Sequence, residues 1–96
     1  MNTNAAAANF YAMIVADKNL RAAKTALAAS KAAYDASLDS GESDAVRLVK
    51  FNVFRNIEDS IKSLESKMSN SAKENGETMH LLTSDEMKSL VAFVYA

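Results

Sequence analysis

The sequence lacks cysteine, proline and tryptophan, and it contains only two glycines among 96 residues. Without cysteine, neither a disulfide nor a thiolate-bound metal can stabilise the fold. Without proline, no residue imposes a break on the interior of a helix. Because alanine, the strongest helix former, is also abundant, the composition predicts an all-α protein.

Charge and hydropathy exclude further classes of protein. The net charge is −1, so no overall field draws the chain to nucleic acid or to an anionic membrane. The longest uncharged run, residues 1–16, is alanine-rich and has no basic segment, so it predicts neither a signal peptide nor a membrane span. The absence of cysteine also suits a reducing compartment. We therefore expect a soluble, cytoplasmic protein that makes no membrane contact.

Motifs for catalysis and for cofactor binding are missing as well. His80 is the only histidine, and no residues at a suitable spacing complete a metal or nucleophilic site around it. The acidic pairs 58–59 and 85–86 each join neighbouring residues, whose side chains point about 100° apart on a helix. The two isolated glycines form no phosphate-binding loop. The sequence therefore predicts a non-enzymatic protein with no cofactor and no metal.

Helical signals predict a hairpin of two long helices within a single domain, residues 1–96. The alanine-rich stretch favours a first helix over about residues 5–38. Gly41 can adopt the left-handed conformation that ends a helix, and Ser43 can cap the helix that follows. A connection this short predicts that the two helices are antiparallel.

The second helix is predicted over about residues 44–69, where an apolar residue recurs every three or four positions. This apolar face comprises Val46, Val49, Val53, Ile57, Ile61, Leu64 and Met68. The polar stretch 70–82 predicts a loop.

A short third helix is predicted over about residues 84–95. Thr83 and Glu86 have the spacing of a capping box, which marks the start of a helix. The apolar face of this helix comprises Met87, Leu90, Val91 and Val94. The whole chain is thus expected to form a small helical bundle.

Two features indicate self-association. The first helix would span roughly 50 Å, whereas a compact globule of this length has a radius of gyration of about 12–13 Å. The stretches FYAMIV (residues 10–15) and LVAFVY (residues 90–95) are apolar around the helix and would leave exposed patches on an isolated monomer. We expect a homo-oligomer, with a dimer favoured.

The first half of the second helix carries a further apolar surface. On a helical projection, Leu48 and Phe51 lie about 200° and 140° from Val46, almost opposite the main apolar face. Arg55 lies between them and Arg47 lies at the edge, and aromatic residues with arginine are typical of protein-contact hot spots. We therefore predict a protein-binding site formed by Arg47, Leu48, Phe51 and Arg55. A foreign protein, a second copy or the third helix could each cover it.

A basic band on the first helix offers an alternative site. Bases next to aromatic residues can bind nucleotides or single-stranded nucleic acid by charge and stacking. The same residues would also suit a solvated face or a partner for acidic side chains on a neighbouring helix. The candidate anion-binding residues are Tyr11, Lys18, Arg21, Lys24 and Lys31.

These features predict a small interaction protein that binds another protein as an inhibitor, an adaptor or a regulator. Its size and the missing catalytic apparatus would suit a small phage-encoded modulator of a host protein. Two alternatives stay open: a binder of nucleotide or nucleic acid, and a structural subunit of an assembly.

Overall fold

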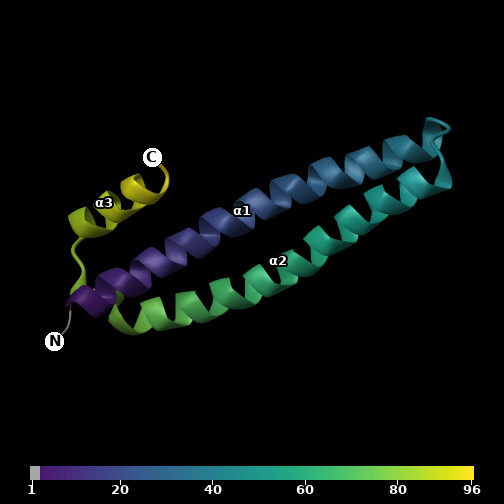
Figure 1. The fold of residues 1–96 in the computed structure, drawn as a ribbon. Helices are drawn as coiled ribbons and strands as arrows, with labels where there is room; N and C mark the ends of the chain where they lie inside the picture. The colour runs from purple at the N-terminus through teal and green to yellow at the C-terminus, as the bar shows by residue number, and fades with distance from the viewer. Residues whose placement is uncertain (1–2) are drawn as a thin grey trace. The chain divides into compact units, whose positions relative to one another are not determined.

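The computed structural model describes residues 3–96, which fold into helices alone (Figure 1). Two long helices, α1 (Thr3–Asp39) and α2 (Asp44–Thr78), are followed by one turn of 3-10 helix, η1 (Met79–Leu81), and by the short α3 (Ser84–Val94). Among these residues there is no strand. The prediction of an all-α fold with two long helices and a short third helix is confirmed.

The turn between α1 and α2 forms as the sequence predicts. Gly41 has a φ of 73° and is the only residue with a positive φ in the described chain. The Ser43 hydroxyl accepts a hydrogen bond of 3.3 Å from the backbone N–H of Val46 in the first turn of α2. Asp44, in that same turn, places a negative charge at the positive end of the helix dipole.

The predicted loop over residues 70–82 is wrong for most of its length, because α2 continues to Thr78. Gly76 lies inside this helix and does not end it. Only η1 and the two residues after it, Leu82 and Thr83, separate α2 from α3.

Tertiary contacts explain why this polar segment is helical. The side-chain amide of Asn9 in α1 donates a hydrogen bond of 3.0 Å to the Thr78 hydroxyl. The Asn75 side chain is buried and its amide nitrogen lies 3.5 Å from the Met13 sulfur. Since helices in proteins gain most of their stability from packing, contacts with α1 extend α2 beyond the region that propensity favours.

Contacts divide the described chain into two compact units, both built from α1 and α2. Unit 1 consists of residues 3–20 and 64–96, and unit 2 consists of residues 21–63. Because the two units share both long helices, the single-domain interpretation stays a prediction. Each unit is described by itself below.

The core of unit 1 lies between α1 and the C-terminal segment. Ala6, Phe10 and Ile14 of α1 are buried against Leu82 and Val94, and each of these five residues is at most 7% exposed. Half-buried residues, Met87 and Leu90 among them, pack against this core. The predicted apolar face of the third helix is confirmed for Met87, Leu90 and Val94, whereas Val91 is 39% exposed.

A capping box starts α3. The Glu86 backbone N–H donates to the Thr83 hydroxyl at 3.1 Å, and the Thr83 backbone N–H donates to the Glu86 carboxylate at 3.0 Å. The prediction for these two residues is confirmed. The hydrogen bond from the Thr83 backbone, followed by that from its side chain, lowers the pKa of Glu86 below its ordinary value of 4.5.

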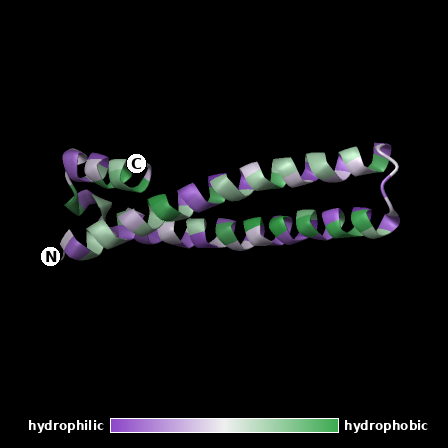
Figure 2. Ribbon diagram, turned by 45° about the horizontal axis from the view of Figure 1, so that its top comes forward, coloured by the Kyte–Doolittle hydropathy of each residue, from purple (hydrophilic) through white to green (hydrophobic). Residues whose placement is uncertain are grey.

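In unit 2 the two helices pack along a regular seam. Less exposed residues recur at alternating intervals of three and four, the heptad spacing of packed helices. Figure 2 shows hydrophobic and hydrophilic residues alternating along α1 and α2. The seam residues are Ala23, Leu27, Ser30, Tyr34 and Ser37 of α1, and Arg47, Lys50, Phe54, Ile57 and Ile61 of α2.

The start of α2 is rotated relative to the predicted packing. Val46, Val49 and Val53 were expected in the packed face, but they are 42%, 62% and 47% exposed. The seam is displaced by one residue, so that Arg47, Lys50 and Phe54 take their places. From Ile57 onward the predicted face is confirmed, because Ile57, Ile61, Leu64 and Met68 are buried or half-buried.

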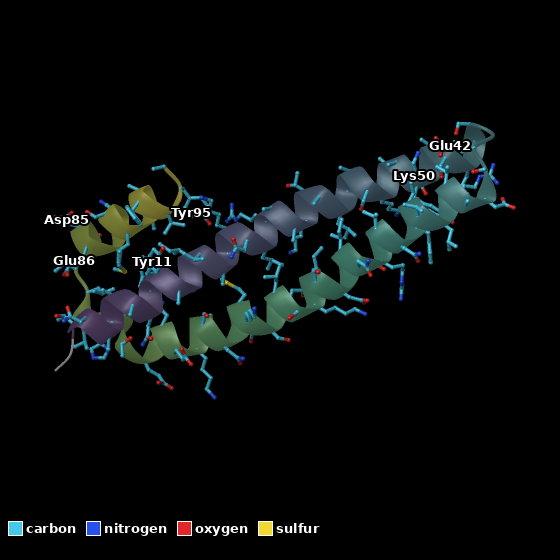
Figure 3. The ribbon with its side chains drawn as sticks, in the orientation of Figure 1. Tyr11, Glu42, Lys50, Asp85, Glu86 and Tyr95 are labelled. Carbon is cyan, nitrogen blue, oxygen red and sulfur yellow. The ribbon has the colours of Figure 1, made fainter. Side chains whose placement is uncertain are left out.

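Polar contacts account for this rotation. The Arg47 side chain donates a hydrogen bond of 3.1 Å from Nε to the backbone oxygen of Ser37. The Lys50 ammonium lies 2.8 Å from the Glu42 carboxylate, next to the turn (Figure 3). Both contacts need their α2 residue on the side that faces α1 or the turn, which turns the valines outward.

Candidate protein-interaction surfaces

Three of the four predicted protein-binding residues meet at one place in unit 2. They surround a shallow hollow of about 280 Å³, which we call the hairpin hollow. Its apolar residues include Leu38 and Leu48, which are 50% and 59% exposed. The lining residues are Tyr34, Leu38, Asp44, Arg47, Leu48 and Phe51.

Two of the three predicted residues in this hollow, Phe51 and Arg47, also stabilise the helical hairpin. The rings of Tyr34 and Phe51 are tilted by 55° with centroids 5.5 Å apart, which is the range of favourable aromatic pairs. Arg47 bonds to the Ser37 backbone and, at 3.4 Å, to the Asp44 carboxylate. Phe51 and Arg47 therefore line the hollow and also stabilise the packing of unit 2, and Leu48 is the most exposed of the three predicted residues.

Arg55, the fourth predicted residue, does not line the hollow. Its guanidinium lies 3.1 Å from the Glu58 carboxylate one turn further along α2. Both side chains are partly exposed, so this ion pair belongs to the surface of α2.

Sequence reasoning missed a second apolar surface of unit 2, the valine face, formed by Val46, Val49 and Val53. Its residues are spaced like a core stripe, and that signal assigned them to the packed side. At 100° per residue, Val49 is turned away from Leu48, so the valine face lies on the other flank of α2. The rotation of α2 in the folded chain is what exposes these three valines.

The candidate anion-binding residues of unit 1 are engaged by α3. The Lys18 ammonium donates a hydrogen bond of 2.8 Å to the backbone oxygen of Val94 at the end of α3. The Tyr11 ring lies 6.3 Å from the ring of Phe93, tilted by 44°. These two residues therefore help to position α3.

The other three members of the basic band belong to unit 2. Arg21, Lys24 and Lys31 are exposed on α1. An anion-binding role for these residues stays a prediction.

The end of α3 combines buried and exposed apolar residues. Val94 is buried on α1 of the same chain, whereas Phe93 is 72% exposed. The Tyr95 hydroxyl hydrogen-bonds to the Asp17 carboxylate, which places Tyr95 beside α1 (Figure 3). The apolar stretch 90–95 thus packs on α1 of its own chain through one side, and its other side is exposed.

A hollow of about 430 Å³ in unit 1 lies between α1 and α2, and we call it the interhelical groove. Its apolar part comes chiefly from α1 and its polar part chiefly from α2. Sequence reasoning could not find it, since it joins residues about fifty positions apart. The lining residues are Tyr11, Ala12, Val15, Ala16, Asn19, Leu64, Lys67, Asn70, Ser71 and Glu74.

Residues 3–96 form neither a metal-ligating cluster nor a helix that could span a membrane. His80 lies in η1, and no group of three or more histidine, cysteine or acidic residues in this range could hold a metal ion. None of the helices there is long and apolar enough to span a membrane.

Comparison with known proteins finds no matching family model, no similar curated protein and no similar solved structure.

Proposed function

We propose that the protein is a non-enzymatic interaction protein that binds another protein through the hairpin end of unit 2. One observation carries this proposal. The five large apolar residues Val46, Leu48, Val49, Phe51 and Val53 are all at least 38% exposed, although they lie within two turns of one helix. Single exposed apolar residues are normal on a protein surface, but groups of them, such as Leu48 with Phe51 and the three valines on the other flank, are typical of interaction sites.

The hairpin hollow suggests the chemistry of the partner. Its lining combines the aromatic rings of Tyr34 and Phe51 with the aliphatic side chains of Leu38 and Leu48. The Asp44 carboxylate at the rim is fully exposed to solvent. A partner helix with a large apolar side chain and a neighbouring basic residue would fill the hollow and pair with Asp44.

The valine face favours a partner that contacts both flanks of α2. A helix in the hairpin hollow would cover Leu48 and Phe51 but would leave the three valines in water. A partner with two contact elements would bury both surfaces. Such a surface suits an inhibitor, adaptor or regulator, and we place its action in the cytoplasm because a chain without cysteine suits a reducing compartment.

Nucleotide or nucleic-acid binding has weaker support. Lys18 and Tyr11 are engaged by α3, which leaves Arg21, Lys24 and Lys31 as the members of the band that lie in unit 2. Lysines on a solvated helix face are equally consistent with no ligand at all.

Site-specific photo-crosslinking tests the proposal. A photoreactive phenylalanine analogue replaces Leu48 in one protein and Ser63 in another, because Ser63 is an exposed polar residue of the same helix and unit. In the cells that naturally make the protein, irradiation should give a discrete adduct from position 48 and none from position 63. The adduct should disappear when Val49→Asp is added and should persist when Asn52→Asp is added.

Two results would contradict the proposal. Equal adducts from positions 48 and 63 would mean that crosslinking is unspecific, and no adduct from position 48 would mean that the surface is not bound. An adduct of twice the 10.4 kDa chain mass would identify the partner as a second copy. Circular dichroism of each variant should show unchanged helicity, since all these positions are exposed.

A further inference from the structure

Two opposite charges line the interhelical groove of unit 1 from the same helix. Lys67 and Glu74 lie seven residues apart on α2, so they share one side of the helix and are about 10 Å apart along its axis. Within residues 3–96, neither the ammonium of Lys67 nor the carboxylate of Glu74 makes a hydrogen bond or an ion pair. The groove therefore presents one free positive charge and one free negative charge at a fixed spacing.

The residues between these charges are short. Asn70 and Ser71 line the groove midway between Lys67 and Glu74. On the α1 side, Ala12 and Ala16 contribute only methyl groups to the lining. Helix axes approach more closely where the contacting side chains are small, so this part of unit 1 can admit another helix.

The spacing of Lys67 and Glu74 fits one particular helix in the groove, namely α2 of a second copy in the antiparallel orientation. A two-fold axis that passes between Asn70 and Ser71 brings Lys67 of one copy to Glu74 of the other, and it forms the same pair a second time. A parallel arrangement would instead oppose lysine to lysine and glutamate to glutamate, which costs free energy. The groove is thus complementary in charge to itself in one orientation only.

We propose that the interhelical groove is the interface of a homodimer in which the two α2 helices cross antiparallel at Asn70 and Ser71. The two reciprocal ion pairs, Lys67 to Glu74, fix the register of the interface. Burial of the apolar side chains that α1 contributes to the groove stabilises the dimer, since one of them, Tyr11, is 42% exposed in the single chain. This interface lies in unit 1 and uses none of the residues of the hairpin hollow, so either proposal can fail alone.

Sedimentation velocity of the full chain, from about 1 μM to about 1 mM, measures the dimer dissociation constant. Lys67→Glu and Glu74→Lys should each raise this constant by about tenfold or more, because each variant creates two like-charge contacts. The double variant Lys67→Glu/Glu74→Lys reverses both charges and should return the constant to within about threefold of the original. Lys73→Glu is the matched control, since Lys73 lies on the same helix but outside the groove.

The single variants also separate pairing from a general effect of net charge. The chain has a net charge of −1, which Lys67→Glu makes more negative and Glu74→Lys makes positive. If net repulsion controlled association, the two variants would shift the constant differently, whereas the proposed pairs require both to weaken it.

The proposal is overturned if the chain stays monomeric over the whole concentration range. It is equally overturned if the double variant fails to recover, or if Lys73→Glu weakens the dimer as much as Lys67→Glu does. All substituted positions are exposed, so circular dichroism should show the same helicity for every variant.

Discussion

The ammonium of Lys18 in α1 donates a 2.8 Å hydrogen bond to the backbone oxygen of Val94, the last residue of α3. The final carbonyls of a helix have no partner within it and carry the negative end of its dipole. A cation supplied by α1 satisfies one of them. This contact, made by residues 76 positions apart, helps to hold the C-terminal helix on unit 1.

Lys18→Met should loosen α3. The variant keeps most of the side-chain length but removes the charge-assisted hydrogen bond, which at this exposed site is worth about 1 kcal/mol. Hydrogen exchange of the α3 amides should accelerate about fivefold or more, with little change in α2. Lys24→Met is the control, because Lys24 is an exposed lysine of the same helix, and it should leave the exchange of α3 unchanged.

The capping box should make α3 sensitive to acid. The pKa of Glu86 is lowered in the folded chain, so its carboxylate stabilises α3 above the unfolded pKa, and this contribution is lost as the pH falls through the lower folded pKa. Amide NMR signals of α3 should therefore show fraying below about pH 4. Glu86→Gln should remove this step, and a step of equal size in that variant would assign it to another carboxylate.

The two glycines should respond oppositely to alanine. Gly41 has a φ of 73°, which alanine adopts only with strain, so Gly41→Ala should lower the free energy of unfolding by about 1 kcal/mol. Gly76 lies within α2, and apart from the nearby backbone of its own helix a Cβ there would meet nothing within 4 Å. Gly76→Ala should raise the same free energy by about 0.5–1 kcal/mol because alanine is the better helix former. Urea denaturation measures both, and a loss of stability in Gly76→Ala would contradict the helical assignment.

Asn75 should tolerate an apolar replacement. Its side chain is 4% exposed, its amide nitrogen contacts the sulfurs of Met13 and Met79, and its oxygen Oδ1 has no hydrogen-bond partner among residues 3–96. Removing a buried polar group that is only weakly satisfied relieves a desolvation cost. Asn75→Leu should therefore leave the free energy of unfolding unchanged or raise it by up to about 1 kcal/mol in urea denaturation. A loss of more than about 2 kcal/mol would show that the polar contacts matter more than the burial.

Truncation of two α2 residues should reveal the rotation of the helix. Ile61 is 7% exposed, and Ile61→Ala should cost about 2–3 kcal/mol of unfolding free energy. Val49 is 62% exposed, and Val49→Ala should change it by less than about 0.5 kcal/mol. Thermal or urea unfolding measures both variants. Similar losses of unfolding free energy at the two positions would contradict the rotation, because they would show that Val49 is packed as the hydrophobic pattern predicts.

The candidate site was only partly predictable. The unusual pairing of aromatic and basic residues on one side of α2 identified Arg47, Leu48 and Phe51, which the structure brings to a single hollow. The pattern could not show that Arg55 pairs with Glu58, because local ion pairs depend on the rotation and rotamers of the helix. It also could not find the interhelical groove, whose two sides come from opposite ends of the chain.

The sequence by itself determined the number and type of the helices, the position of the hairpin turn and the start of α3. Each depends on local chemistry: alanine propensity, the positive φ that glycine allows at Gly41, and the reciprocal hydrogen bonds of Thr83 and Glu86. Tertiary structure alone decided where α2 ends and which of its faces is packed. Both outcomes depend on contacts with α1, such as Asn9 with Thr78 and Arg47 with the Ser37 backbone, which no local pattern records.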